Sequence, residues 1–455
     1  MSSSLRQDLT FTSATALVIS NMIGTGIFTT TGYLAGDLGR PSLVISIWVV
    51  GAVVAMAGCL SYAELGINLP QSGGEYVYLR EVWGPTWGFL SGWISFFAGF
   101  AGPVAAGALA VSEYLGHFFP ALSEGPNEPG LGFLHFGPGR LLALAVIGAF
   151  VLVNVLGLKL AARLQVVLTA LKIGVLGTFL ILAFLVGHGD WNNFALTAQR
   201  TSTHGVGAQF AVSLIFVMFA YSGWNAAAYV AEEMKDPQRT LPLALVTGTV
   251  IVALFYLALN VAFIYALPLA SLKGVVRVGA DAATALFGVA GGGIFSGIMA
   301  AGILSCVSAM VLVGPRVSYA MARDGCFFAD AGKVHSRWHT PVRAILYQGL
   351  ASTVMVLVGD FEKLIYYISF ALILFAALAT AGIFRARRRP DWKRLRAVNW
   401  GYPLVPGVFV GASLWMLTYT LFLRPRESSL GLLTLAAGAL VYRFMFQKTR
   451  AASAR

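Results

Sequence analysis

Residues 21–30 read NMIGTGIFTT and lie inside the first long apolar stretch of the chain. Because glycine is a poor helix former, Gly24 and Gly26 predict a break in the middle of a helix that is otherwise long enough to cross a membrane. Close packing of two helices on small residues is the alternative explanation for such glycines. The two glycines are only two positions apart, however, and so do not lie on one face of a helix. We therefore expect the first membrane-spanning helix to be broken here.

The composition of the whole chain is that of an integral membrane protein. Of its 455 residues, 58% are hydrophobic and 11% are charged, and the mean hydropathy of +0.77 lies outside the range of soluble domains. Apolar stretches of about 20 residues, the length that crosses a bilayer as a helix, recur about twelve times, whereas a transmembrane β-barrel needs short alternating strands. The sequence thus predicts an all-α membrane protein. Its expected spans lie near residues 12–35, 41–65, 86–115, 139–158, 162–187, 206–232, 241–266, 284–321, 341–359, 362–384, 403–423 and 428–446.

The net charge of +12 is explained by the membrane and its lipids rather than by a nucleic-acid partner. The charges fall in short loops beside the spans and form no folded basic face. Lys and Arg are in excess in the loops on the side of the N-terminus, which predicts that both termini are cytoplasmic. This excess includes RARRRPDWKRLR at 385–396, which is alternatively a binding site for anionic lipid headgroups. We expect no cleaved signal peptide and a location in the plasma membrane, which in bacteria is the inner membrane.

Residues that commonly hold metals or cofactors are sparse. Cys59, Cys306 and Cys326 fall in two predicted spans and one loop, so no disulfide framework is implied. His335 and His339 lie in a loop without another obvious ligand, so no metal site is expected. The sequence places no paired carboxylates and no activated nucleophile at membrane depth. We therefore expect neither a cofactor nor an enzyme.

A second break is expected in the sixth span, where residues 220–228 read AYSGWNAAA. Ser222, Gly223 and Asn225 lower the helix propensity at this point, again in mid-membrane. Two broken helices five spans apart are typical of transporters built from two five-helix repeats, because an odd number of spans inverts the second repeat. The chain is then one transmembrane domain over 1–455, with repeats over about 10–187 and about 206–384 and two further helices over about 403–446.

An unwound membrane helix exposes backbone groups that need partners. Each unpaired N–H or C=O is costly in hydrocarbon, so a break implies a cavity that holds water or a ligand. Free N–H groups at a helix start favour a carboxylate, and free carbonyls at a helix end favour an ammonium group. The breaks therefore predict a binding site for an α-amino acid. The expected carboxylate-binding residues are Thr25, Gly26 and Ile27, and the expected amino-binding carbonyls are those of Met22, Ile23, Phe219, Ala220 and Ser222.

The side chains near the two breaks indicate neutral substrates. Neither stretch contains Asp, Glu, Arg or His, so a charged substrate side chain has no obvious counter-ion there. Phe219, Tyr221 and Trp224 are expected to line or gate the pocket, with ordinary core packing of these aromatic rings as the alternative.

Lys172 lies near the middle of the fifth span, in LTALKIGVL. A charge at this depth is expensive, so its side chain is expected to face the protein interior, because the apolar residues on both sides extend too far for it to reach an interface. Its ammonium group is expected either to take the place of a coupling cation, with Ser305 and Ser308 of span eight as candidate partners, or to exchange a proton during transport. Both roles argue against a sodium ion bound at the same place.

Six segments of the chain are, in order, NMIGTGIF (21–28), LPQSGGEYVYLREVWGPTWGFLSGW (69–93), GLKLAARLQVVLTALK (157–172), FAYSGWNAAAYVAEEMKDPQRTLP (219–242), GPRVSYAMARDG (314–325) and HTPVRAILYQG (339–349). In this order they resemble the amino acid/polyamine/organocation superfamily of transporters, and within it the L-type amino acid transporters and their bacterial relatives. The resemblance implies a five-plus-five inverted-repeat (LeuT-like) fold, an amino-acid substrate and transport by alternating access.

The resemblance also implies roles for individual residues. It relates the chain to sodium-independent members with a lysine in span five, which are mostly obligatory exchangers, while neighbouring groups couple uptake to protons. By this resemblance Thr25 and Gly26 bind the substrate carboxylate, Met22 offers an amino-binding carbonyl, Phe219 is the gating aromatic, Asn225 lines the site and Lys172 is the span-five lysine.

Two features depart from the family pattern. Ser222 replaces the first of two glycines that are common before the tryptophan, and its bulk and hydroxyl favour smaller or polar substrates. The loop between spans three and four has no cysteine, so a disulfide-linked accessory chain is not expected. The sequence therefore predicts a sodium-independent exchanger of neutral L-amino acids. A proton-coupled symporter in which Lys172 titrates and a signalling transceptor are the alternatives.

Overall fold

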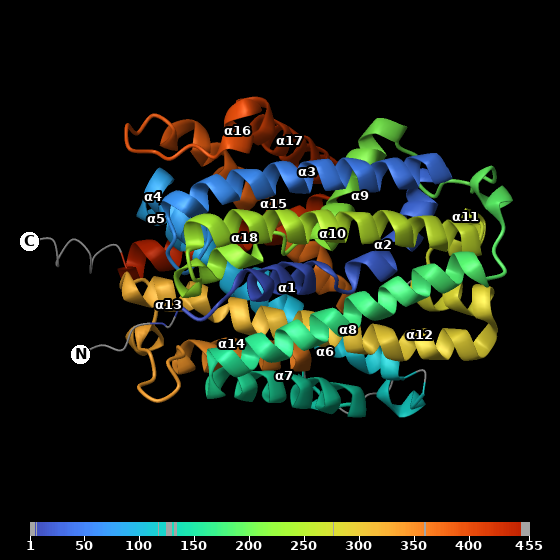
Figure 1. Cartoon of the computed structure of the whole chain (residues 1–455), viewed down its shortest axis with the longest axis horizontal. Helices are drawn as coiled ribbons and strands as arrows, with labels where there is room; N and C mark the ends of the chain where they lie inside the picture. The colour runs from blue at the N-terminus through green and yellow to red at the C-terminus, as the bar shows by residue number, and fades with distance from the viewer. Residues whose placement is uncertain are drawn as a thin grey trace, which may run out of the picture.

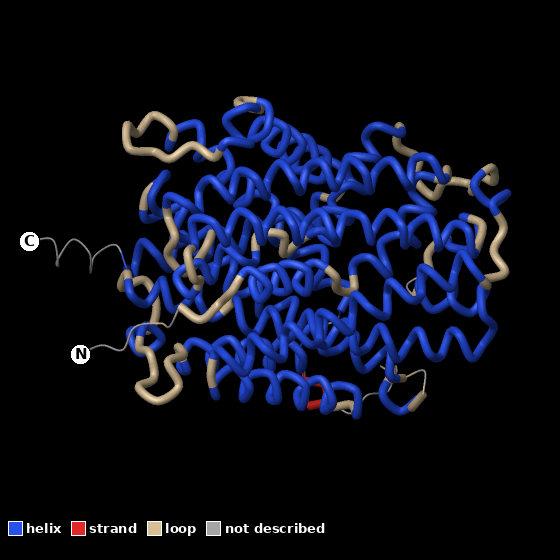
Figure 2. The backbone as a smooth tube through the Cα atoms, in the orientation of Figure 1, coloured by secondary structure: helices blue, strands red, loops and turns tan. Residues whose placement is uncertain are grey.

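Helices make up nearly all of the structure. The computed structural model of the protein describes residue 5 and residues 7–116, 118–123, 130–131, 134–275, 277–358 and 361–446. Within these residues the only strands are β1 (Gly130–Leu131) and β2 (Leu134–His135), which form one short antiparallel pair (Figure 2). The predicted all-α fold is confirmed.

Nine helical segments of the described chain are long and apolar enough to cross a membrane. They are α1–α2 (Phe11–Leu38), α3 (Pro41–Asn68), α5–η1–α6 (Pro85–Leu115), α7 (Pro138–Leu156), α8 (Leu158–Leu185), α9–η4 (Val206–Glu233), α10 (Pro237–Ala266), α12–α13 (Val278–Arg323) and α17 (Leu404–Leu423). Three further helices carry shorter apolar stretches, namely α14 (Val342–Val358), α15 (Phe361–Ala386) and α18 (Pro425–Val441), which continues into η6 (Tyr442–Phe446). Every predicted apolar stretch falls on one of these helices.

The remaining helices are short connections between these segments. They are α4 (Glu75–Trp83), η2 (Pro120–Leu122), η3 (Trp191–Phe194), α11 (Leu269–Leu272), η5 (Ala329–Gly332) and α16 (Arg396–Trp400).

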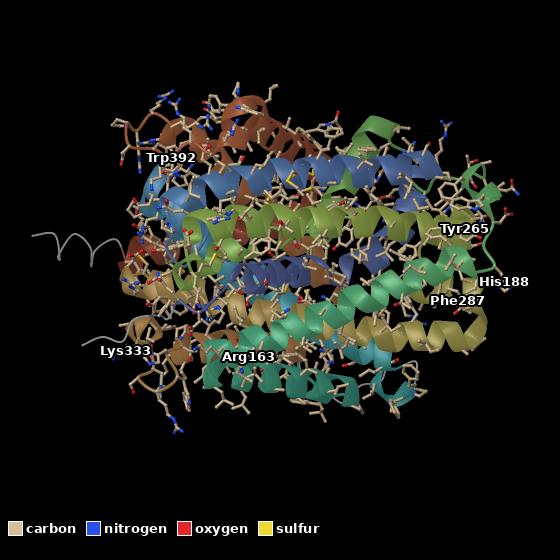
Figure 3. All side chains as sticks on the ribbon, viewed as in Figure 1. Arg163, His188, Tyr265, Phe287, Lys333 and Trp392 are labelled. Atoms are coloured by element: carbon tan, nitrogen blue, oxygen red, sulfur yellow. The ribbon has the colours of Figure 1, made fainter. Side chains whose placement is uncertain are left out.

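The long helices run side by side along one axis, and the loops gather at the two ends of the bundle (Figure 1). In Figure 3, Lys333 and Trp392 lie at the left end, whereas His188 and Tyr265 lie at the right end. Helical backbone satisfies its own hydrogen bonds in hydrocarbon, and irregular backbone at the ends reaches water. The arrangement is therefore that of a bundle that crosses a bilayer along its long axis.

Helix α8 shows how the bundle sorts its polar side chains. Gln165, Thr169 and Lys172 are buried, and their spacing places them on one helix face. Leu171 and Leu185, on the remaining surface of the helix, are 52% and 75% exposed. Because lipid is the solvent at this depth, the apolar surface faces outward and the polar face lies inside the bundle.

Both predicted helix breaks are present. Helix α1 (Phe11–Met22) ends before α2 (Gly26–Leu38) begins, and α9 (Val206–Tyr221) ends before η4 (Ala226–Glu233) begins. The helices α2 and α9 pack together, as do α1 and η4. The two breaks thus lie next to each other inside the bundle, although the boundaries of the two repeats stay a prediction.

Two glycines allow the broken segments to touch. A Cβ atom on Gly26 would lie 2.7 Å from the Cα atom of Ala220, and one on Gly223 would lie 2.7 Å from the Cβ atom of Asn21. Gly223 also has a φ of 92°, a conformation that residues with a side chain rarely adopt. The glycines therefore serve both explanations offered by the sequence, because they interrupt the helices and let the two backbones pack closely.

The basic segment 385–396 folds against α3, chiefly around one buried carboxylate and also through two hydrogen bonds between Lys393 and Asn68. Glu64 is fully buried and accepts hydrogen bonds from Arg387 Nε and Nη2, each at 2.7 Å. It also accepts from Trp392 Nε1 at 3.1 Å and from the backbone N–H of Leu395 at 3.0 Å. Much of this segment is therefore part of the folded protein.

Candidate functional site

A cavity of about 120 Å³ lies at the two breaks. This volume holds several waters or a small solute, since one water needs roughly 10–15 Å³ on this measure. The residues predicted for the site that line this cavity are Met22, Thr25, Gly26, Phe219, Ala220, Ser222, Trp224 and Asn225. The two stretches that the sequence singled out therefore face one common space.

The start of α2 offers free amide groups to this cavity. Among the described residues, no acceptor bonds the backbone N–H of Thr25, Gly26 or Ile27, and the first such bond in this turn runs from Phe28 N to Thr25 O at 3.1 Å. These amides lie at the positive end of the helix dipole, which attracts a carboxylate. The side chain of Ile27 is fully buried and does not line the cavity, so only its backbone is suited to the predicted role.

The carbonyls at the ends of α1 and α9 already accept hydrogen bonds within the protein. The Tyr256 hydroxyl of α10 lies 2.6 Å from Met22 O and 2.8 Å from Ala220 O. Its single proton serves only one of them fully, and each carbonyl has two lone pairs. Both carbonyls therefore retain the capacity to accept from a substrate amino group. The sequence analysis missed Tyr256. The only hint in the sequence was that this polar hydroxyl lies near the middle of the seventh span.

Lys172 bonds the end of α1. Its Nζ donates to the carbonyl of Ile23 at 2.6 Å and to that of Ser20 at 3.4 Å. The Ile23 carbonyl therefore faces the lysine, and Ile23 does not line the cavity. The structure thus does not bring this carbonyl together with the other predicted amino-binding carbonyls, and its role in binding the substrate amino group stays a prediction.

Of the two predicted serine partners of Lys172, Ser305 hydrogen-bonds to other residues instead. Ser305 Oγ lies 2.6 Å from Ser20 Oγ, which in turn lies 2.6 Å from Thr169 Oγ1. Gln165 Nε2 donates to both Ser305 O and Ser305 Oγ at 3.3 Å. Ser308 is buried one turn further along α12, and neither serine accepts a hydrogen bond from Lys172 in the described structure. The hydroxyls instead join α1, α8 and α12 beside the lysine.

Phe219 and Trp224 line the cavity, but Tyr221 does not. The Tyr221 hydroxyl donates to Trp48 O at 3.3 Å, and its ring centroid lies 5.0 Å from that of Tyr256. The structure thus places Tyr221 in the packed core beside the cavity, in line with the alternative of core packing, and a gating role for it stays a prediction. Trp224 combines both roles, because it reaches the cavity while its ring packs against that of Tyr62 at 4.7 Å.

Glu75 is an ionisable residue of the cavity that the sequence analysis missed. It is the first residue of α4, 150 positions before Asn225, and its Oε1 accepts a hydrogen bond from Asn225 Nδ2 at 2.8 Å. Its side chain is only 3% exposed and lines the cavity. The one signal available was a glutamate after two glycines in a segment between two spans, QSGGEYVY at 71–78.

The model of one protein family, the amino acid permeases, matches residues 9–443. The chain belongs to the amino acid permease family. The resemblance to the amino acid/polyamine/organocation superfamily is thereby confirmed, and this permease is a multi-pass membrane transporter of amino acids rather than an enzyme.

Similar proteins share almost the full length of this permease. The serine/threonine exchanger SteT of Bacillus subtilis is 31% identical over 96% of this chain and 96% of its own. The human large neutral amino acids transporter small subunit 2 is 29% identical over 96% of this chain and 80% of its own. The human cystine/glutamate transporter is 28% identical over 96% of this chain and 85% of its own.

Ser222 fits the break of this permease without strain. Its φ is −56° and its ψ is 149°, an extended conformation that any residue adopts, and the positive φ falls on Gly223 instead. The serine lines the cavity, and its backbone N–H donates to Phe219 O at 2.9 Å. The departure from the family pattern therefore changes the cavity surface rather than the backbone.

Proposed function

We propose that this permease exchanges small or medium neutral L-amino acids across the plasma membrane without sodium. The observation that carries the proposal is the meeting of free amides at the start of α2 with the carbonyls of Met22 and Ala220 around one cavity. A zwitterion offers one group to each end of this arrangement. Substrate then moves by alternating access around this site.

The lining of the cavity supports neutral substrates of modest size. Phe219 and Trp224 supply apolar surface, and Ser222 supplies a hydroxyl and reduces the space. The names of the similar proteins cover serine and threonine, large neutral amino acids, and cystine with glutamate, so relatives differ in the side chain that they accept. Within this range the polar, narrowed lining favours alanine, serine and threonine.

Independence from sodium is supported by the position of Lys172. Its ammonium group donates to the carbonyls of Ser20 and Ile23, which are the type of oxygen ligand that a bound cation requires. A fixed ammonium at these oxygens leaves no need for a metal ion. Proton-coupled symport with Lys172 as the titrating group is the alternative mechanism.

The remaining parts of the proposal concern topology and partners. We propose an inverted repeat over about 10–187 and about 206–384, with two additional helices over about 403–446. Both termini are then cytoplasmic, because most of the basic loop residues lie at their end of the bundle. The proposed protein works without a disulfide-linked accessory chain.

The proposed exchange is tested with purified protein in sodium-free liposomes. Uptake of radiolabelled alanine is measured with and without unlabelled alanine inside. Exchange predicts that uptake requires internal amino acid and does not respond to added sodium. Uptake into empty liposomes that rises with an inward proton gradient would establish the symporter instead, and protein-free liposomes serve as the control.

The carboxylate end of the site is tested by Thr25→Val. Thr25 lines the cavity beside the free amides, so the loss of its hydroxyl is expected to weaken binding of alanine, serine and threonine by a similar factor. One lost hydrogen bond to a charged group corresponds to roughly 1.5–3 kcal/mol, or about 10- to 150-fold in affinity. Competition binding with the three amino acids measures the effect, and a changed order of preference among them would contradict the assignment.

A further inference from the structure

The start of α4 is held against the second broken helix. Gly73 and Gly74 both have a positive φ, and the backbone N–H of Gly73 donates to Tyr229 O at 3.1 Å. A Cβ atom on Gly74 would lie 2.7 Å from the ring of Tyr229. This tight turn directs the next side chain, that of Glu75, into the wall of the cavity.

Hydroxyl and amide groups surround the Glu75 carboxyl. Asn225 Nδ2 donates to it, and the hydroxyls of Tyr62 in α3, Tyr78 in α4 and Tyr229 in η4 are the titratable groups that face it. The hydroxyls of Tyr62 and Tyr78 are buried and have no partner in good hydrogen-bond geometry in the described structure. Among the described residues, no lysine, arginine or histidine forms an ion pair with Glu75.

The nearby cations are paired with other carboxylates. Arg80, on the same helix as Glu75, pairs with Asp324 and Glu81. Arg316 in α13 pairs with Glu233 at the end of η4. Among the described residues that line the cavity there is no lysine, arginine or histidine.

Glu75 differs in this respect from Glu64 and Glu233, the other glutamates that are buried in the described part of the chain. Glu64 and Glu233 are both fully buried, and each has a bidentate arginine partner, Arg387 and Arg316 respectively. An unpaired carboxylate is costly to bury, and a bound proton removes this cost. Helix α4 lies between the candidate spans, and burial raises the pKa of the Glu75 carboxyl to about 7.

We propose that Glu75 forms a proton-binding site in the wall of the substrate cavity, and that its proton must be bound for the cavity to hold a neutral amino acid. This proposal rests on the proposed function of the cavity. With the proton bound, the Glu75 carboxyl is neutral and can donate one hydrogen bond. A substrate with an uncharged side chain then meets no charge in the cavity wall, and a substrate hydroxyl can accept this hydrogen bond. Without it, the cavity carries an uncompensated negative charge beside a neutral ligand.

The proposal predicts that the affinity for alanine depends on pH. Because only the protonated fraction binds, the apparent dissociation constant is expected to be about tenfold higher at pH 8 than at pH 6. At pH 8 each bound alanine is expected to take up about one proton. Calorimetry of the purified full-length protein in two buffers with different ionisation enthalpies measures both quantities.

Two variants assign this pH dependence to Glu75. Glu75→Gln preserves the shape and remains neutral, so it is expected to bind alanine equally at pH 6 and pH 8 without proton uptake. Glu81→Gln alters a more exposed glutamate on the same helix and is expected to behave as the unaltered protein does. Size-exclusion chromatography checks that both variants fold.

Several results would overturn the proposal. Equal alanine affinity at pH 6 and pH 8 in the unaltered protein would do so, and this measurement needs no variant to fold. Retention of the full pH dependence in Glu75→Gln would do so as well. Either result would leave amino-acid transport intact, whereas absence of amino-acid binding at every pH would overturn the proposed function along with it.

Discussion

Replacing Lys172 with alanine is expected to lower amino-acid transport about a hundredfold. The loss of a hydrogen bond from a charged group typically costs roughly 1.5–3 kcal/mol. Since each 1.4 kcal/mol corresponds to a factor of ten, this loss amounts to about two orders of magnitude at the upper end of the range. The ammonium group is 2.6 Å from the Ile23 carbonyl at the end of α1. Without it, this carbonyl and that of Ser20 lose a donor beside the break, and α1 loses its fixed position. Exchange of radiolabelled alanine in liposomes measures the loss.

Two further variants separate the charge of Lys172 from its packing. Lys172→Met keeps an apolar stem of similar length, so it is expected to lose transport to the same extent as Lys172→Ala. Lys159→Ala removes a lysine from the same helix whose side chain is 65% exposed and lies 3.6 Å from Asp8, and it is expected to leave transport unchanged. Normal transport by Lys172→Met would show that the ammonium group has no role.

The second large effect is expected on stability, from Glu233→Ala. Glu233 and Arg316 are almost fully buried and form two hydrogen bonds, at 2.7 and 3.1 Å, between the end of η4 and α13. Removal of the carboxylate leaves the guanidinium group buried and unpaired, which typically costs about 3–5 kcal/mol. The expected result is a clearly lower midpoint of thermal unfolding in detergent, followed by the fluorescence of the purified protein.

The neighbouring glutamate provides a matched control. Glu232 pairs with Arg323 at 3.3 Å, but the two side chains are 31% and 55% exposed. Exposed pairs contribute about 0–1 kcal/mol, so Glu232→Ala is expected to change the midpoint little. The double variant Glu233→Leu/Arg316→Met removes both charges and is expected to recover most of the lost stability. Equal midpoints for Glu233→Ala and Glu232→Ala would contradict this account.

The sequence predicted the spans and the two breaks because both follow from local composition. A segment that crosses the hydrocarbon of a bilayer has to be a long apolar helix. Gly24, Gly26 and Gly223 lower the stability of such a helix where they occur. Both signals are local, so no knowledge of long-range contacts was needed. Lys172 was predicted to face inward for the same reason, since a charge has no other favourable place at that depth. Its contacts with the end of α1 show that it does.

The features of the site that the sequence did not show concern the direction of the backbone in the breaks and contacts between distant segments. Within a break the backbone no longer follows the helical period, so the sequence did not show that Tyr221 turns toward Trp48 while Trp224 reaches the cavity. Glu75 and Tyr256 come from segments distant in sequence, and only the packing of α4 and α10 against the breaks brings them to the site. Ile23 was assigned to the substrate because its carbonyl was expected to face the same side as that of Met22.

The buried carboxylate of Glu64 limits how freely the basic segment 385–396 can leave the folded protein. Its four hydrogen bonds come from Arg387, directly after the end of α15, from Trp392 and from the backbone N–H of Leu395. A polybasic tail that binds lipid as a flexible tether needs freedom to follow the headgroups. Here a displacement of Arg387 or Trp392 would take hydrogen-bond partners away from the buried Glu64 carboxylate of α3, which costs free energy. These hydrogen bonds therefore tie the chain that follows α15 to α3, unlike a flexible lipid tether.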